Sequence, residues 1–179
     1  MRLGNLFLIA LCSLLVFSSC SKMIFSESMF KALDASSVPK VQYYVSRQIV
    51  LRRELNKGEA AVANGKIKFR GGKYYEFITI PRGAQGTSFS SYTPGGSVFM
   101  DLSFYRTGTD RTLRFDNSNC KFPEKAPDGS KPFGVFWTAD SSIGRPVRRV
   151  KFGDKDYELR KGSFVSHLLV KKKFYGFFE

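Results

Sequence analysis

The feature that most limits the fold of this chain is a series of short strand-like runs between Val41 and Lys171, none of which shows sustained helical periodicity. The runs are rich in β-branched and aromatic residues, and Gly, Pro, Asn and Asp lie between them. Such side chains pack well on a pleated sheet, and the intervening residues favour turns. The pattern predicts an all-β fold, a small antiparallel β-sandwich or barrel.

One hairpin is predicted in detail near the C-terminus. Val147–Phe152 and Lys155–Leu159 are joined by Gly153-Asp154, which suits a two-residue turn. This turn sets Val150 opposite Tyr157 on an apolar face. The other face then carries opposite charges, with Lys151 against Asp156 and Arg149 against Glu158. Two such pairs are typical of a solvated outer surface.

A second hairpin is predicted between Ile67–Arg70 and Tyr74–Phe77. A three-residue loop, Gly71-Gly72-Lys73, aligns the apolar residues of the two strands on one face. A two-residue loop would instead set Ile67 opposite Glu76. We therefore expect the three-residue loop.

The N-terminus carries the features of a bacterial export signal. One positive charge, Arg2, precedes the uncharged apolar run Leu6–Phe17, which is too short to span a bilayer that needs about 20 residues. Ser18-Ser19-Cys20 follows, and small residues before a cysteine at this place resemble the lipobox of bacterial lipoproteins. The alternatives are an ordinary secretory signal cut near Ser19 and an uncleaved anchor.

The lipobox resemblance implies that the signal, residues 1–19, is removed and that Cys20 becomes a lipidated N-terminus. Burial of its acyl chains at ~0.8 kcal/mol per CH₂ group would make the membrane attachment effectively permanent. Cys12 leaves with the signal, so Cys120 is the remaining thiol. An intramolecular disulfide is therefore not expected.

Residues 20–38 form a lipidated tether in this interpretation, and residues 39–179 form the β domain. Four apolar residues of the tether share one helical face: Phe25, Met29, Phe30 and Leu33. They predict a short helix that lies on the membrane or on the domain and ends before Pro39. A free linker is the alternative.

Further segments carry a second resemblance, namely Val41–Ser46 leading into Ile49–Leu51, the hairpin around Lys151–Asp154, and His167–Lys171. Together they look like a group of small, uncharacterised lipoproteins of the Bacteroidota, and this resemblance brings no activity with it. In that phylum, surface export is associated with acidic residues soon after the lipidated cysteine. This chain has Ser21-Lys22-Met23 there, which implies an outer-membrane anchor that faces the periplasm.

The charge is the unusual quantity of the sequence, with 29 Lys and Arg against 15 Asp and Glu and a net charge of +14. This balance favours an anionic partner, which we expect to be an anionic lipid, an acidic glycan or another envelope protein. The export signal argues against nucleic acid, and a basic surface that serves solubility is the alternative. Basic clusters occur at Arg52-Arg53, Lys66/Lys68/Arg70/Lys73, Arg145/Arg148/Arg149/Lys151, Arg160-Lys161 and Lys171–Lys173. The candidate contact residues are Arg52, Arg53, Arg145, Arg148, Lys171, Lys172 and Lys173.

Catalytic groups have little support in the sequence. One His and three Cys leave too few ligands for a zinc, haem or iron–sulfur site, so we expect neither a metal nor a cofactor. His167 lies in a strand pattern and Cys120 in a hydrophilic loop, and neither position indicates a nucleophile or a base. Paired carboxylates are harder to exclude, with Asp101 and Asp116 as candidates.

The sequence thus predicts a non-catalytic binding or scaffolding module of the cell envelope, such as an accessory subunit of an envelope complex. The alternative is a hydrolase that acts on cell-wall or glycan substrates through paired carboxylates. A pocket that holds Asp101 or Asp116 with a second acid at ~5–9 Å would favour the hydrolase.

Overall fold

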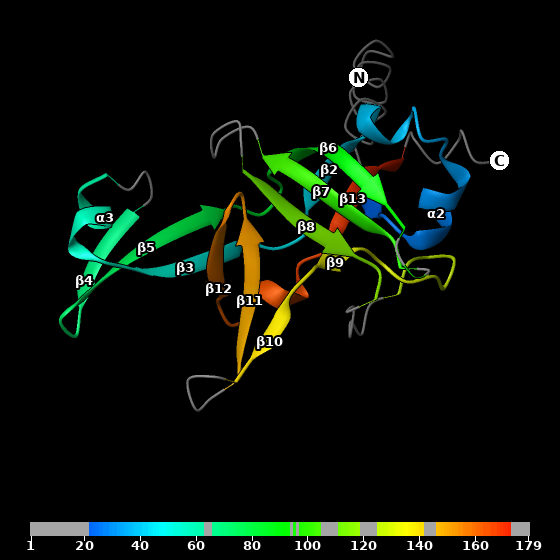
Figure 1. The fold of residues 1–179 in the computed structure, drawn as a ribbon. Helices are drawn as coiled ribbons and strands as arrows, with labels where there is room; N and C mark the ends of the chain where they lie inside the picture. Colours follow the sequence, from blue (N-terminus) through cyan, green and yellow to red (C-terminus); the bar gives the residue numbers. More distant parts are fainter. Residues whose placement is uncertain are drawn as a thin grey trace, which may run out of the picture.

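Strands dominate the computed structural model, which describes residues 22–62, 66–93, 95, 97–104, 111–118, 125–141 and 146–172. The predicted all-β class is confirmed, because thirteen strands in these residues join into one antiparallel sheet with two short α-helices beside it (Figure 1). The helices are α2 (Glu27–Ala32) and α3 (Lys57–Val62), with the 3-10 turns η1 (Val38–Lys40) and η3 (Ser163–Val165). The strands are β1 (Lys22–Ile24), β2 (Gln42–Val45), β3 (Ile49–Leu55), β4 (Lys66–Arg70), β5 (Lys73–Ile80), β6 (Gln85–Tyr92), β7 (Phe99–Phe104), β8 (Thr112–Asp116), β9 (Gly134–Val135), β10 (Thr138–Asp140), β11 (Val147–Phe152), β12 (Lys155–Leu159) and β13 (Leu168–Lys171).

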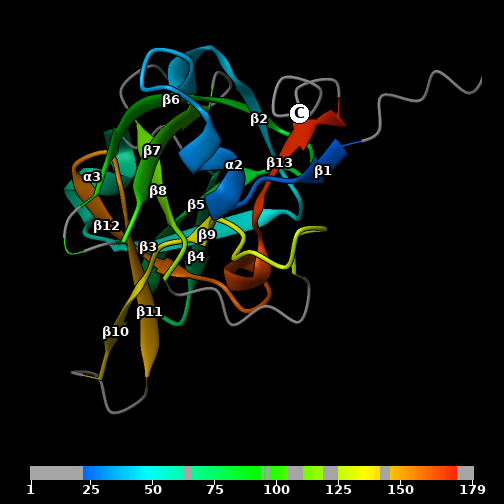
Figure 2. The same ribbon diagram turned by 90° about the vertical axis from the view of Figure 1, so that its right-hand side faces the viewer.

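The strands follow one open path, in the order β1-β13-β2-β6-β7-β8-β11-β12-β3-β5-β4, with β10 beside β11 and β9 beside β8. Within the described residues this path ends at β1 and at β4, so the fold is sandwich-like and open rather than a closed barrel. Near one end, β1 lies beside β13 and α2 stands in front of the curved sheet (Figure 2). Near the other end, β3, β5, β4 and α3 project from the molecule on the side away from α2 (Figure 1). We call these four elements the arm.

The core consists of apolar side chains from most strands of the path and from the segment before β2, whereas β4 contributes none. Tyr43, Met100, Phe115, Phe133 and Tyr157 are completely buried. Removing such surfaces from water, at ~25 cal/mol per Å² of apolar area, is the main stabilising term of the fold.

Residues 22–38, which the sequence places in a tether, pack against this core. The predicted helix forms as α2, and Met29 is buried on its inner face. Phe25 is buried just before α2, and its ring meets that of Tyr43 edge to face at a centroid distance of 5.0 Å. Because β1 also pairs with β13, a free linker is wrong for this part of the tether. Cys20 lies outside the described residues.

The hairpin of β11 and β12 has the predicted register. Val150 lies opposite Tyr157, and Gly153-Asp154 forms the two-residue turn. The charged face is confirmed in its placement, but two of its residues form ion pairs with other strands. Arg149 binds Asp140 of β10, and Glu158 binds Arg52 of β3. These ion pairs connect the outer face of the hairpin to the neighbouring strands β10 and β3.

The predicted loop of the other hairpin is wrong. β4 and β5 are joined by two residues, and Ile67 lies opposite Glu76. Gly71 and Gly72 both have positive φ angles, 57° and 76°, which is the geometry of a tight type I′ turn. The prediction relied on pairing apolar residues of the two strands. It failed because β4 is mostly exposed on both faces, so no buried face fixes its register.

The strand β6 has no clear alternation of apolar and polar residues in its sequence, because three of its eight residues are Ser. It nevertheless lies inside the sheet, between β2 and β7. Gly86 explains part of this position inside the sheet, since a Cβ atom there would lie 2.9 Å from Cε1 of Phe104. The absence of a side chain lets the buried Phe104 ring cover the strand.

We expect Gly86→Ala to lower the free energy of unfolding by about 1–3 kcal/mol, because the buried Phe104 ring has little room to move. Urea unfolding of the full chain in neutral detergent measures the change. Gly58→Ala is the matched control, since a Cβ there meets Asn56 at an ordinary 3.5 Å. Equal stability of the two variants would contradict the close packing at Gly86.

Asp128 joins the loop before β9 to the start of α2. Its carboxylate accepts hydrogen bonds from the hydroxyls of Ser28, of Ser26 at 3.3 Å and of Ser130 at 2.6 Å. Burial by itself raises the pKa of Asp128, but the hydrogen bonds from Ser130, Ser28 and Ser26 outweigh it and lower the pKa from 3.8 to about 2. The ionised carboxylate is therefore the form that the fold favours.

This shift predicts a pH-dependent stability. Because the folded pKa lies below the unfolded value of 3.8, the stabilisation is present above that pH and is lost as the pH falls toward 2. We expect Asp128→Asn to flatten the decline of the unfolding free energy over this range, measured by urea unfolding at successive pH values. Parallel curves for the variant and the original chain would overturn this role of Asp128.

Candidate anionic-ligand site

The arm has two faces, and a buried carboxylate defines the inner one. Glu76 of β5 is 1% exposed and accepts hydrogen bonds from Arg53 at 3.2 Å and from the Tyr157 hydroxyl at 3.0 Å. Arg53 also pairs with Glu59 of α3. Burial tends to lower the pKa of Arg53, but the carboxylates of Glu59 and Glu76 raise it. The pKa of Tyr157 is raised by burial and then by its hydrogen bond to Glu76.

We expect Glu76→Gln to destabilise the fold by about 1–3 kcal/mol, because Arg53 and Tyr157 lose a charged acceptor in a buried place. Tyr157→Phe should lower the free energy of unfolding by less. The double variant Glu76→Gln, Tyr157→Phe should lose less stability than the sum of the two single variants, since Glu76 and Tyr157 share one hydrogen bond. Urea unfolding of the three variants measures this coupling.

Glu54→Gln is the control for that series, because Glu54 pairs with Lys73 where both side chains are half exposed. Such a pair contributes about 0–1 kcal/mol. A loss in Glu76→Gln no larger than in Glu54→Gln would show that the buried carboxylate does not hold the arm.

The outer face follows from the alternation of side chains along the strands. Since Glu76 points inward, Tyr75 and Phe77 point outward. Directly opposite residues lie on the same face, so β4 contributes Lys68 beside Tyr75, and β3 contributes Arg52 beside Phe77. Phe77 thus lies between Lys66 and Arg52, and Tyr75 lies between Lys68 and Glu54.

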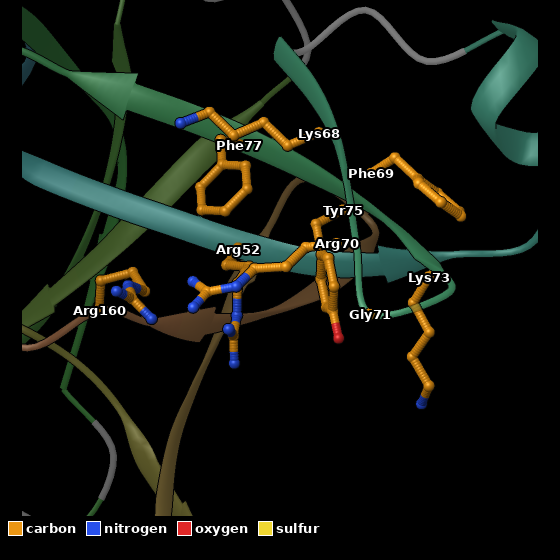
Figure 3. A pocket seen from close by; sticks show the side chains of 9 residues that line it. All are labelled: Arg52, Lys68, Phe69, Arg70, Gly71, Lys73, Tyr75, Phe77 and Arg160. Carbon is orange, nitrogen blue, oxygen red and sulfur yellow. The ribbon is translucent and has the colours of Figure 1, made fainter.

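These residues line a hollow of about 720 Å³. Its lining consists of Arg52, Lys68, Phe69, Arg70, Gly71, Lys73, Tyr75, Phe77 and Arg160. Figure 3 shows the side chains of Arg52, Arg70 and Arg160 directed toward the same space beside the Phe77 ring, whereas Phe69 points away. The guanidinium of Arg52 lies 5.2 Å from the Tyr75 ring centre, and the Lys68 ammonium lies 5.4 Å from that of Phe77.

Every charged residue of this lining is a cation. Arg52 is neutralised by Glu158, and Lys73 lies 2.8 Å from Glu54, whose hydrogen bond raises the pKa of Lys73. Lys68, Arg70 and Arg160 are exposed. The arrangement can hold an oxyanion with planar guanidinium groups while a flat or apolar part of the ligand contacts the rings.

Of the predicted contact residues that the structure describes, only Arg52 lines this hollow. Arg53 faces inward to Glu76. Arg148 stacks on aromatic rings, 4.1 Å from the ring centre of Phe164 and 4.8 Å from that of Trp137. Lys171 lies in β13 near the other end of the sheet path, and Lys172 follows it. Two others, Arg145 and Lys173, lie outside the described residues.

The sequence did indicate the missing cations as clusters around Lys68, Arg70 and Arg160, but not their meeting. Arg52 and Glu158 come together across β3 and β12, which are far apart in the chain. The available signal was the alternation of Tyr75 and Phe77 with buried residues in β5. This alternation predicts the hollow only together with the correct register of β4 against β5.

A second, smaller hollow of about 300 Å³ contains Asp101 and Asp156. Arg114 occupies both carboxylate oxygens of Asp101, at 2.8 and 3.0 Å. Asp116 is completely buried, accepts a hydrogen bond from Ser118, and is not in the lining of either hollow. His167 is likewise buried and lines neither of them. Cys120 lies outside the described residues.

The described residues contain no group of three His, Cys, Asp or Glu residues placed to hold a metal ion. Among them, no helix has the length and apolar character needed to cross a membrane. No protein-family model, curated protein or solved structure matches the chain.

Proposed function

We propose that this protein is a non-catalytic binding module of the cell envelope that holds an anionic partner in the hollow of the arm. The observation that carries the proposal is the lining itself, in which five cations surround Tyr75 and Phe77. The net charge of +14 would draw an anion toward the protein before contact. An accessory subunit of an envelope complex is the setting that we propose for it.

The location belongs to the same proposal and rests on the sequence. The lipobox-like Ser18-Ser19-Cys20 supports lipidation at Cys20, and Ser21-Lys22-Met23 supports an outer-membrane anchor that faces the periplasm. The anionic groups that a basic site in an envelope can meet include the carboxylates and phosphates of lipids, glycans and other proteins. The planar forks of Arg70 and Arg160 fit each of these oxyanions.

The hydrolase alternative has less support. Asp101 and Asp156 do share a hollow, but Arg114 occupies both oxygens of Asp101. The second sequence candidate, Asp116, is buried outside both hollows. A binding module is the better account of the geometry.

We expect the triple variant Lys68→Ala, Arg70→Ala, Arg160→Ala to bind anionic probes about 10–100 times more weakly than the original chain. Each exposed charge contributes roughly 0.5–1 kcal/mol, and about 1.4 kcal/mol corresponds to a factor of ten. The probes are fluorescent poly-L-glutamate, heparin and phosphatidylglycerol vesicles, each titrated against the full chain in neutral detergent or in a neutral bilayer.

The matched control removes the same charge elsewhere, with Lys40→Ala, Lys125→Ala and Lys131→Ala, all at exposed positions. Equal weakening in both triple variants for every probe would overturn the hollow as a site and leave a diffuse basic surface. Lipidation is measured separately, by incorporation of a labelled fatty acid that Cys20→Ala should abolish. Incorporation that persists in Cys20→Ala would overturn the anchor.

A further inference from the structure

The strand β4 forms one end of the sheet path and has a single neighbour, β5, among the described residues. Its outer edge therefore carries backbone N–H and C=O groups with no described strand beside them. The other end of the path is β1, which has only three residues, whereas β4 has five. Short edge strands resist pairing with other chains, and longer ones permit it.

The two faces of β4 carry different kinds of side chain, basic on one face and apolar on the other. Lys66, Lys68 and Arg70 alternate on the outer face with the hollow. Ile67 and Phe69 alternate on the opposite face, where the Phe69 ring packs on Tyr74 at a centroid distance of 4.9 Å. Phe69 remains 64% exposed, which makes it one of three large apolar side chains that are exposed among the described residues.

We propose that β4 accepts an extended segment of a partner protein as an additional strand. Acidic side chains of that segment would face Lys66, Lys68 and Arg70, and its apolar side chains would face Ile67 and Phe69. The inference rests on the proposed function, because Lys68 and Arg70 belong both to the hollow and to this edge. It names the anionic partner as a protein segment with alternating acidic and apolar residues.

The charges argue against a second copy of this chain as the occupant. Antiparallel pairing of two β4 strands would place Lys and Arg side chains opposite one another, and like charges in directly opposite positions are destabilising. The whole chain, at +14, would add to this repulsion. A segment of opposite charge removes both penalties.

The position of the arm argues against the membrane that would carry the anchor. Cys20 comes just before β1, and the arm projects from the side of the molecule away from α2 (Figure 1). An anchor at Cys20 would therefore present β4 away from its own bilayer. A glycan in the hollow would leave the backbone groups of the strand edge unused, whereas an added strand pairs with them.

The test titrates the full chain in neutral detergent with a short fluorescent peptide of alternating Glu and Val, read by anisotropy. Two control peptides keep its composition and charge. One has all Glu residues before all Val residues, and the other keeps the alternation but has N-methylated backbone amides that cannot join a sheet. We expect the alternating peptide to bind at least ten times more tightly than either control.

Protein variants test the two faces of β4 separately. Lys66→Glu, Lys68→Glu and Arg70→Glu together should reverse the preference, so that a peptide of alternating Lys and Val binds more tightly than the Glu–Val peptide. Phe69→Ser should weaken binding of the alternating peptide several-fold, because it removes the apolar contact on the face of β4 that also carries Ile67. All four positions are exposed, so the variants are expected to fold.

The outcomes separate the two proposals. Equal binding of the alternating, block-ordered and N-methylated peptides would overturn strand addition but preserve an anionic site that depends on Lys68 and Arg70. Binding of heparin or vesicles without any of the peptides would also overturn strand addition alone. Failure of peptides, heparin and vesicles together would overturn the proposed function and the inference with it.

Discussion

The arrangement of the arm depends on one buried carboxylate, Glu76. Removing a carboxylate from water is costly unless charged and hydrogen-bonding partners replace the water, and Arg53 and Tyr157 do so here. Arg53 belongs to β3, and Tyr157 belongs to β12. Glu76 therefore connects β5 both to a neighbouring strand of the arm and to a strand outside the arm. A slip of β5 by one residue would turn Glu76 outward and Tyr75 inward. The basic and aromatic composition of the outer face therefore follows from what is buried beneath it.

The structure also sorts the many cations by what they contact. Arg53, Arg114 and Arg149 bind carboxylates of the same chain and hold strands together. Arg148 lies over aromatic rings, where its long side chain contributes packing as well as charge. Arg70 and Arg160 at the hollow have no carboxylate or ring partner of this kind among the described residues. A net charge of +14 thus contains a structural part and a part available for recognition.

The sequence predicted those elements in which every local signal agrees. In the β11–β12 hairpin, the turn, the apolar pair Val150–Tyr157 and the opposite charges require the same register, and the structure has it. The β4–β5 hairpin failed because β4 has no buried face, so the two glycines with positive φ decide its register alone. The hollow could not be predicted either, because Arg52 and Arg160 join it across strands that are distant in the chain.

The lysines of β4 admit a simpler explanation than recognition, since charged residues on an edge strand keep sheets from joining one another. Protection alone, however, calls for polar side chains on both faces of the strand. Phe69 contradicts that expectation, because it leaves a large apolar ring 64% exposed on the same edge. Charges on one face and an aromatic ring on the other repel a copy of the same edge while retaining a surface that a complementary strand can bury. This combination gives selectivity by charge and affinity by apolar contact.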